Sequence, residues 1–293
     1  MSQRLFSTLA EWLAAESVVL ASVLATRGAS PRHGGAQMLV TESRIDGSVG
    51  GGRLELHTIA AARALLSSGR DNAAVAIDLT GRDGAHGVCG GSMQIALRRC
   101  QGAADRIRAI AIADSLAAGR RVILDADTLG ADATLTLEPA PRLLILGAGH
   151  CGLALCRAAL PLGYDLHVLD DRSDGYDPSA WVGATCHRER AALPALLDSE
   201  RRVAAVLQNR DWRSDVALLP LLAARPPLYI GMMGSRKRIR QVFKALPELG
   251  DLCARIHAPV GLPIGAETPE ELAISVLAQV IAAFSAQLRG TGT

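Results

Sequence analysis

A glycine-rich segment near the middle of the chain carries the strongest chemical signal. Gly147, Gly149 and Gly152 follow an apolar run and open a predicted helix. This spacing permits a tight turn and lets backbone amides approach a pyrophosphate, which the helix N-terminus stabilises. Asp170 ends the next predicted strand, where a carboxylate accepts hydrogen bonds from a ribose diol and repels a 2′-phosphate. The pattern predicts a phosphorylated ligand, NAD-like if it is a dinucleotide; glycines that only form the turn are the alternative.

A cysteine lies in a second glycine-rich segment. Cys89 stands between Gly87-Val88 and Gly90-Gly91, so we expect its thiol to be sterically open and close to backbone amides. A thiolate forms more readily beside such donors and binds soft metal centres. Free cysteine is also among the most buried residue types. The residues alone favour this simpler role, a small buried side chain.

Residues 231–238 have the composition of an anion site. A predicted strand ends there and a helix begins, at the edge where open α/β sheets bind ligands. Free amides around Gly234 and the Ser235 hydroxyl could hold a phosphate, with Arg236 and Lys237 adding charge. A solvated basic helix face is an equally good interpretation.

A third glycine run precedes another predicted helix. Gly50-Gly51-Gly52 could bind an anion together with Arg27, Arg32 and His33 of a nearby loop, although a simple turn is favoured. The sequence has no metal pair at HxxxH spacing, no GxSxG segment and no Walker loop. No catalytic residue set can therefore be assembled from spacing.

Composition narrows the class of protein. The 31 basic and 29 acidic residues give a formal net charge of +2, too balanced for a general nucleic-acid binder. Met1–Ala15 lacks the basic and apolar regions of a signal peptide, and Gly, Asp or Arg interrupts every apolar run before the roughly 20 residues of a membrane span. The six cysteines have no CxxC spacing and are expected to be reduced thiols. These features indicate a soluble, cytoplasmic protein.

The chain length of 293 residues favours two compact domains over one. Residues 1–138 are predicted to form a mixed α/β domain, and Pro139-Ala140-Pro141 marks the boundary because it interrupts helix and strand alike. In the first domain apolar patterning predicts helices over 1–15, 53–68 and 103–118, and strands over 18–26, 36–41, 73–79, 93–97, 122–124 and 134–137.

Residues 142–293 alternate strand and helix, which is typical of a Rossmann-like doubly wound parallel sheet. Strands are expected over 143–146, 166–169, 203–207 and 228–230, and helices over 150–160, 191–197, 214–223 and 235–246. Thr268 to Glu271 predicts the capping box of a last helix. The fold class is therefore α/β, with an N-terminal mixed domain followed by a C-terminal Rossmann-like domain.

Taken together, these segments resemble the XdhC/CoxI family, the accessory proteins of xanthine dehydrogenase and related molybdenum hydroxylases. The matching segments span nearly the full length in the family's order, and their combination is far more specific than any one of them. They are residues 25–36 (ATRGASPRHGGA), 47–55 (GSVGGGRLE), 89–91 (CGG), 146–152 with 169–172, 229–237 (YIGMMGSRK) and 256–271 (IHAPVGLPIGAETPEE).

The resemblance implies a chaperone that turns over no substrate itself. It would bind the molybdenum cofactor, as molybdopterin or its cytosine dinucleotide, and protect it during sulfuration by an L-cysteine desulfurase. It would then insert the cofactor into a xanthine dehydrogenase-type molybdenum hydroxylase, and we expect it to act as a homodimer. Carried onto this chain, Cys89 becomes a thiol near the molybdenum or its incoming sulfur. The cofactor-binding set is then Cys89, Gly90, Gly91, Gly147, Gly149, Gly152, Asp170, Gly234, Ser235 and Arg236.

One segment departs from the family pattern. Residues 208–215 read QNRDWRSD, where many relatives have Thr-His or a similar polar pair followed by His. No ligand role is assigned there. The alternative function is an NAD-dependent oxidoreductase, or an NAD-sensing protein, that uses the Rossmann site; the sequence offers no acid or base for hydride transfer.

Overall fold

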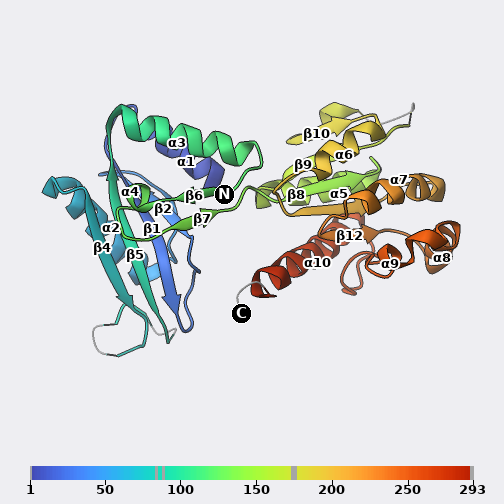
Figure 1. The fold of residues 1–293 in the computed structure, drawn as a ribbon. Helices are drawn as coiled ribbons and strands as arrows, with labels where there is room; N and C mark the ends of the chain where they lie inside the picture. Colours follow the sequence, from blue (N-terminus) through green and yellow to red (C-terminus); the bar gives the residue numbers. More distant parts are fainter. Residues whose placement is uncertain (1, 83–84, 88–89, 173–176, 291–293) are drawn as a thin grey trace. The chain divides into compact units, whose positions relative to one another are not determined.

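The structure, a computed structural model, describes residues 2–82, 85–87, 90–172 and 177–290. The chain forms two compact units, Met1–Pro139 and Ala140–Thr293, each described here by itself (Figure 1). The division falls inside the Pro139–Pro141 segment, where proline removes the amide that a helix or a central strand needs.

A five-stranded antiparallel sheet forms the centre of the N-terminal unit. Its first strand in the chain is the middle strand of the sheet, and the first six residues of that strand are buried. Buried β-branched and leucine side chains on both faces explain why the strand sits there. In spatial order the strands are β3 (Ile45–Gly47), β2 (Gln37–Val40), β1 (Val18–Arg27), β5 (Ser92–Cys100) and β4 (Asn72–Asp78).

Helices cover both faces of this sheet. Alternate side chains of β1 point to opposite sides, so Val18 and Leu20 pack against α1 (Ser2–Trp12) and α3 (Gly102–Ala117). Val19 and Ala21 pack against α2 (Gly52–Ser68) on the other face. The unit ends with a small hairpin of β6 (Val122–Leu124) and β7 (Leu135–Leu137), joined through α4 (Ala126–Leu129).

The C-terminal unit is built on a five-stranded parallel sheet. In spatial order its strands are β10 (Ala184–His187), β9 (Asp165–Leu169), β8 (Arg142–Leu146), β11 (Val203–Leu207) and β12 (Tyr229–Met232). The chain starts at β8, runs outward to β10 and then crosses back to β11, so the direction of winding reverses between β8 and β11. Open α/β sheets bind ligands beyond the carboxyl ends of the strands at this point.

Helices cover both faces of the parallel sheet as well (Figure 1). One face packs against α5 (His150–Ala159) and α10 (Pro269–Gly290). The other packs against α6 (Leu193–Leu197), α7 (Trp212–Ala224), α8 (Arg236–Ala245) and α9 (Gly250–Cys253). Short 3₁₀ turns span Leu160–Leu162, Pro178–Ala180, Arg190–Ala192 and Pro247–Leu249. The predicted fold class, a mixed α/β domain followed by a Rossmann-like domain, is confirmed.

Helix α10 begins at the predicted capping box. The backbone N–H of Glu271 donates to Thr268 Oγ1 at 3.2 Å, and the N–H of Thr268 donates to Glu271 Oε2 at 3.0 Å. Among the described residues, 269–286 form the stretch long and apolar enough to cross a bilayer by length and composition. Val276, Leu277 and Val280 of that stretch lie in the core that α10 shares with α5, so packing within this unit accounts for part of its apolar character.

Several short elements were not predicted from the sequence, among them β3, β10 and α4. β3 and β10 are edge strands of three and four residues, and β10 consists of Ala, Thr, Cys and His with no buried residue among them. α4 is a single turn, which begins because Asp125 accepts a hydrogen bond from the N–H of Thr128. None of the three carries the apolar periodicity from which longer elements are predicted.

A cluster of charges ties together the amino ends of the parallel strands. Asp165 at the start of β9 pairs with Arg142 of β8 at 2.7 Å and with Arg201, which is 4% exposed and precedes β11, at 3.2 Å. Burial alone would raise the pKa of the Asp165 carboxyl, but hydrogen bonds with His167 and Arg142 outweigh burial and hold that pKa well below its usual range. The ionised carboxylate therefore stabilises the register of three strands.

We predict that Asp165→Asn lowers the free energy of unfolding of the C-terminal unit by about 3 kcal/mol, because two largely buried guanidinium groups lose their counter-charge. The stabilisation from a lowered carboxyl pKa is present above the unfolded value of 3.8 and is lost as the pH falls through and below it. The difference between wild type and variant should therefore shrink on acidification. Urea unfolding followed by circular dichroism at several pH values measures both effects.

The matched control for this prediction is Asp198→Asn. Asp198 pairs with Arg225 at 2.6 Å, but the two side chains are 67% and 58% exposed. An exposed pair contributes at most about 1 kcal/mol, so this variant should unfold nearly as the wild type does. Equal losses in the two variants would contradict the role given to the buried cluster.

Candidate functional site

The predicted glycine turn lies at the carboxyl end of β8, at the switch point of the parallel sheet. Gly147 has φ +117°, and a Cβ there would come within 2.8 Å of the carbonyl of Gln208, the residue after β11. A Cβ on Gly152 would lie 2.6 Å from the Gly147 carbonyl oxygen. These two glycines are therefore required by the left-handed turn and by the close seating of α5 on the strand ends.

Gly149 differs from its two neighbours because the fold does not require a glycine at this position. Its φ is −85°, which any residue adopts, and a Cβ on it would meet no atom within 4 Å. It is the N-cap of α5, and no side chain caps that helix. The first turn of a helix has unpaired amides and a partial positive charge. The space beside Gly149 therefore suits an anion such as a phosphate.

Asp170 lies next to this turn but is already engaged. The carboxylate is 3% exposed, and Oδ2 accepts the Ala148 N–H at 2.7 Å. Arg172 donates Nε to Oδ1 at 2.8 Å and Nη2 to Oδ2 at 2.5 Å. Burial would raise the pKa of Asp170, but the hydrogen bonds from Arg172 and Ala148 outweigh burial and lower it. The carboxylate ties the turn to the end of β9, and its predicted bond to a ribose diol stays a prediction.

The segment after β11 brings polar side chains to the same edge. Gln208 is 8% exposed, and its Oε1 lies 3.3 Å from the position of a Cβ on Gly152. Asn209 donates Nδ2 to Oδ1 of Asp215 at 2.8 Å. Sequence reasoning left this segment unassigned because it departs from the family pattern. The sequence nevertheless indicates a candidate ligand site here, because the carboxamide residues Gln208 and Asn209 directly follow an entirely apolar strand at the switch point.

The loop between β12 and α8 carries the second predicted anion site. Gly234 has φ +157°, and Ser235 caps α8 by accepting the N–H of Arg238 at 3.3 Å. Arg236 and Lys237 are exposed. The Ser235 oxygen is thus used by the helix itself, although its hydroxyl proton and the exposed guanidinium of Arg236 are compatible with phosphate binding.

A buried ion pair joins this loop to the segment after β11. Arg238 Nη2 lies 2.5 Å from Oδ2 of Asp215, a carboxylate with no exposed surface. Burial raises the pKa of Asp215, because it outweighs the hydrogen bonds from Asn209 and Arg238 that would lower this pKa. Arg238 also donates to the carbonyl of Arg210 at 3.1 Å. The pair fixes the start of α8 relative to the loop that contains Gln208 and Asn209.

In the N-terminal unit the structure accounts for Gly91 by packing and for Gly90 by its backbone conformation, since Gly90 has φ +87° and a Cβ on it would meet no atom within 4 Å. A Cβ on Gly91 would lie 2.3 Å from the Ala29 carbonyl oxygen, and one on Gly28 would lie 2.9 Å from the Gly90 oxygen. Two backbone segments therefore meet here without intervening side chains. Cys89, the predicted thiol ligand, lies outside the described residues. Among the residues that are described, no group of three or more His, Cys, Asp or Glu could hold a metal ion.

At the Gly50-Gly51-Gly52 turn, the backbone amides that could bind an external anion already bind the Glu55 carboxylate. Oε2 of Glu55 accepts the N–H groups of Val49 and Gly51, both at 3.2 Å, and the Ser48 hydroxyl at 2.5 Å. Burial would raise the pKa of Glu55, but these hydrogen bonds outweigh it and lower the pKa. The favoured interpretation of this run, a turn rather than an anion site, agrees with this arrangement.

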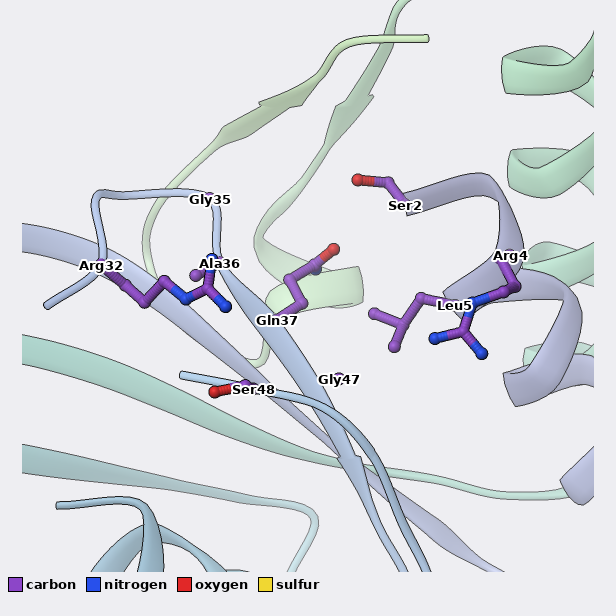
Figure 2. Close-up of a pocket in the computed structure, with 9 residues that line it drawn as sticks. All are labelled: Ser2, Arg4, Leu5, Arg32, Gly35, Ala36, Gln37, Gly47 and Ser48. Carbon is purple, nitrogen blue, oxygen red and sulfur yellow. The ribbon is translucent and has the colours of Figure 1, made fainter. Parts of the chain in front are cut away.

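Beside this turn is a cavity of about 220 Å³. Figure 2 shows Arg32 from the loop after β1 and Arg4 from α1 approaching it from opposite sides, with Gln37 and Ser48 between them. Arg4 pairs with Asp46 at 2.9 Å, whereas Arg32 forms no ion pair with any described residue. The cavity is a second, smaller location that is compatible with an anion.

Comparison with known proteins places both units in one family. Residues 143–280 match the model of the XdhC Rossmann domain, and residues 12–77 match that of the XdhC and CoxI family. The fold is similar to the crystal structure of a xanthine dehydrogenase from Bacillus halodurans, with a TM-score of 0.78 over 97% of this chain and 96% of that one, at 23% identity.

Three curated relatives extend the match. The uncharacterized protein YqeB of Escherichia coli K12 is 30% identical over 89% of this chain and 42% of its own length. A probable xanthine dehydrogenase subunit of Bacillus subtilis 168 is 32% identical over 50% of this chain and 43% of its own length. This chain therefore spans less than half the length of YqeB and of the B. subtilis subunit. The molybdenum cofactor insertion chaperone PaoD of E. coli K12 is 26% identical over 92% of this chain and 84% of its own length. The chain belongs to the XdhC and CoxI family.

Proposed function

We propose that this protein is a molybdenum cofactor chaperone. It binds the cofactor, protects it while an L-cysteine desulfurase supports its sulfuration, and inserts it into a xanthine dehydrogenase-type molybdenum hydroxylase. The observation that carries the proposal is the match to PaoD, named a molybdenum cofactor insertion chaperone, which runs through both units. We further propose that the protein works in the cytoplasm as a homodimer; the five described cysteines are free thiols, as a reducing compartment would leave them.

The residues at the carboxyl edge of the parallel sheet fit the anionic end of such a cofactor. The uncapped first turn of α5 and the space beside Gly149 suit its phosphate. Ser235 and Arg236 would add a hydroxyl and a guanidinium from α8. In the N-terminal unit, Cys89 would bind near the molybdenum or its incoming sulfur, with Gly90 and Gly91 shaping the loop. The bound cofactor brings the molybdenum chemistry, and this chain supplies binding and protection from water.

An NAD-dependent oxidoreductase or an NAD-sensing protein would use the same glycine turn. Such a protein needs an acceptor for the ribose diol at the end of β9. Asp170 holds that position, but both of its oxygens already accept hydrogen bonds, two of them from the Arg172 side chain. This engagement speaks against the diol contact of Asp170 that is typical of NAD enzymes, and NAD binding is measured alongside as the direct test of these alternatives.

We predict that Cys89→Ala weakens binding of the molybdenum cofactor about ten-fold or more, through loss of a thiolate contact. Anaerobic titration of the purified protein with the cofactor measures this affinity. A second assay measures transfer of the cofactor to an apo-hydroxylase, with and without the desulfurase and L-cysteine. Hydroxylase activity should appear with wild type and depend on the desulfurase. Cys253→Ala is the matched control, since it removes a thiol on α9, and it should behave as wild type. Firm NAD binding without cofactor binding would overturn the proposal.

A pair of glycine variants tests the proposed phosphate-binding site beside Gly149, at the N-terminus of α5. Gly149→Ala should fold normally, because the added methyl enters open space at an ordinary φ, yet it should weaken cofactor binding by filling the position of the phosphate. Gly152→Ala should instead lower the melting temperature, because its Cβ would overlap the Gly147 oxygen. Thermal unfolding and cofactor titration of both variants separate the two roles. If Gly149→Ala bound the cofactor with wild-type affinity, the proposed phosphate-binding site would be ruled out.

A further inference from the structure

A buried acceptor without a described partner lies beside the first turn of α5, the helix whose N-terminus is the predicted anion site. Among the described residues nothing donates a hydrogen bond to Oε1 of Gln208, although the side chain is only 8% exposed. A buried polar atom left unpaired destabilises the folded state. Most buried polar groups are paired in folded proteins, so an exception at the ligand-binding edge calls for an explanation.

The position of Gln208 follows from the alternation of β11. Ala204 and Val206 point to the face covered by α5, whereas Ala205 and Leu207 point to the opposite face. Gln208 continues this alternation toward α5, and its Oε1 comes within 3.3 Å of the Cβ position of Gly152 in the first turn of that helix. The backbone N–H of Gln208 donates to the Leu146 carbonyl at 2.8 Å, which fixes the residue beside the end of β8. The free acceptor therefore lies at the helix terminus where the anion is expected.

The residue predicted to receive a ribose hydroxyl offers no such free acceptor. Both oxygens of Asp170, on the β9 side of the turn, accept hydrogen bonds from Ala148 and Arg172. Gln208 lies on the β11 side of the same turn and has the acceptor that Asp170 lacks. A ligand whose phosphate is bound by α5 would satisfy Gln208 if a hydroxyl or amino donor lay close to that phosphate.

We propose that Gln208 recognises the ligand at this edge, accepting a hydrogen bond from a ribose hydroxyl of a nucleoside diphosphate moiety whose phosphates bind the first turn of α5. The site then discriminates a nucleotide from pyrophosphate alone. The inference rests on the proposed function only in taking this edge as a ligand site, and it assigns the nucleotide part of a dinucleotide cofactor to β8 and β11.

Calorimetric titration of the full chain with three probes tests this assignment. ADP carries both the ribose hydroxyls and the pyrophosphate group, 2′,3′-dideoxy-ADP lacks the hydroxyl donors, and inorganic pyrophosphate lacks the ribose altogether. For wild type we expect ADP to bind about ten-fold more tightly than the dideoxy analogue. Gln208→Met, which keeps the length of the side chain and removes the carboxamide, should remove that difference and leave pyrophosphate affinity unchanged.

Thermal unfolding distinguishes a ligand-binding role of Gln208 from a purely structural one. Gln208→Met should melt at or above the wild-type temperature, because the unpaired acceptor is gone. The control Gln279→Met removes a carboxamide in the same unit whose Oε1 accepts from Tyr229 at 2.6 Å and from the Gly261 N–H at 2.8 Å. This control should melt at a lower temperature than wild type while its ratio of ADP to dideoxy-ADP affinity stays the same.

Three results would overturn the inference. Wild type could bind ADP and dideoxy-ADP equally, Gln208→Met could weaken ADP and pyrophosphate to the same extent, or wild type could bind none of the three probes. Transfer of the molybdenum cofactor is measured separately, so the two failures are distinguishable. A protein that delivers the cofactor but shows no Gln208-dependent nucleotide binding contradicts this inference alone, and the reverse pattern contradicts the proposed function alone.

Discussion

The arrangement of the C-terminal unit depends on how closely the first turn of α5 approaches the strand ends. At Gly152 there is no room for a Cβ, because the Gly147 carbonyl oxygen would lie 2.6 Å from it, and at Gly147 the backbone of Gln208 would lie 2.8 Å away. This double contact of backbone with backbone sets the height of the helix above the sheet. It directs the unpaired amides of α5 to the carboxyl edge and buries Gln208 beneath them. A side chain at either glycine would move the helix and every group that depends on it.

Much of this architecture could be predicted from the sequence, because long elements carry their own periodicity. Strands such as Val203–Leu207 are wholly apolar, and the capping box at Thr268 and Glu271 marks a helix start by its chemistry alone. The edge strands β3 and β10 escaped prediction, since short segments with little burial have no pattern to read. Their positions are imposed by the neighbouring strand, which is information from tertiary structure.

The candidate site was less accessible to sequence reasoning, for a different physical reason. The glycines lie in a strand-to-helix turn and Asp170 follows β9, as their spacing predicts, yet the state of the carboxylate depends on Arg172 and on the Ala148 amide. In the same way, Gly50 to Gly52 has the composition of an anion site, and only the structure shows that Glu55 fills it. A sequence contains potential donors and acceptors, but pairing decides which of them remain available to a ligand. The place of Gln208 after an apolar strand is visible in the sequence, but only the structure shows that its acceptor has no described partner.

The strand order of the parallel sheet has a consequence for synthesis of the protein. β8 is made first in this unit, yet it lies in the middle of the sheet between β9 and β11. Until the ribosome has added Val203–Leu207, one edge of β8 has no neighbour, and its Leu143 to Leu146 stretch, buried in the finished protein, is exposed beside it. Unpaired apolar edges recruit strands from other chains. A nascent chain that stalls between β9 and β11 is therefore prone to aggregate, and elongation through Val203–Leu207 covers the exposed edge of β8.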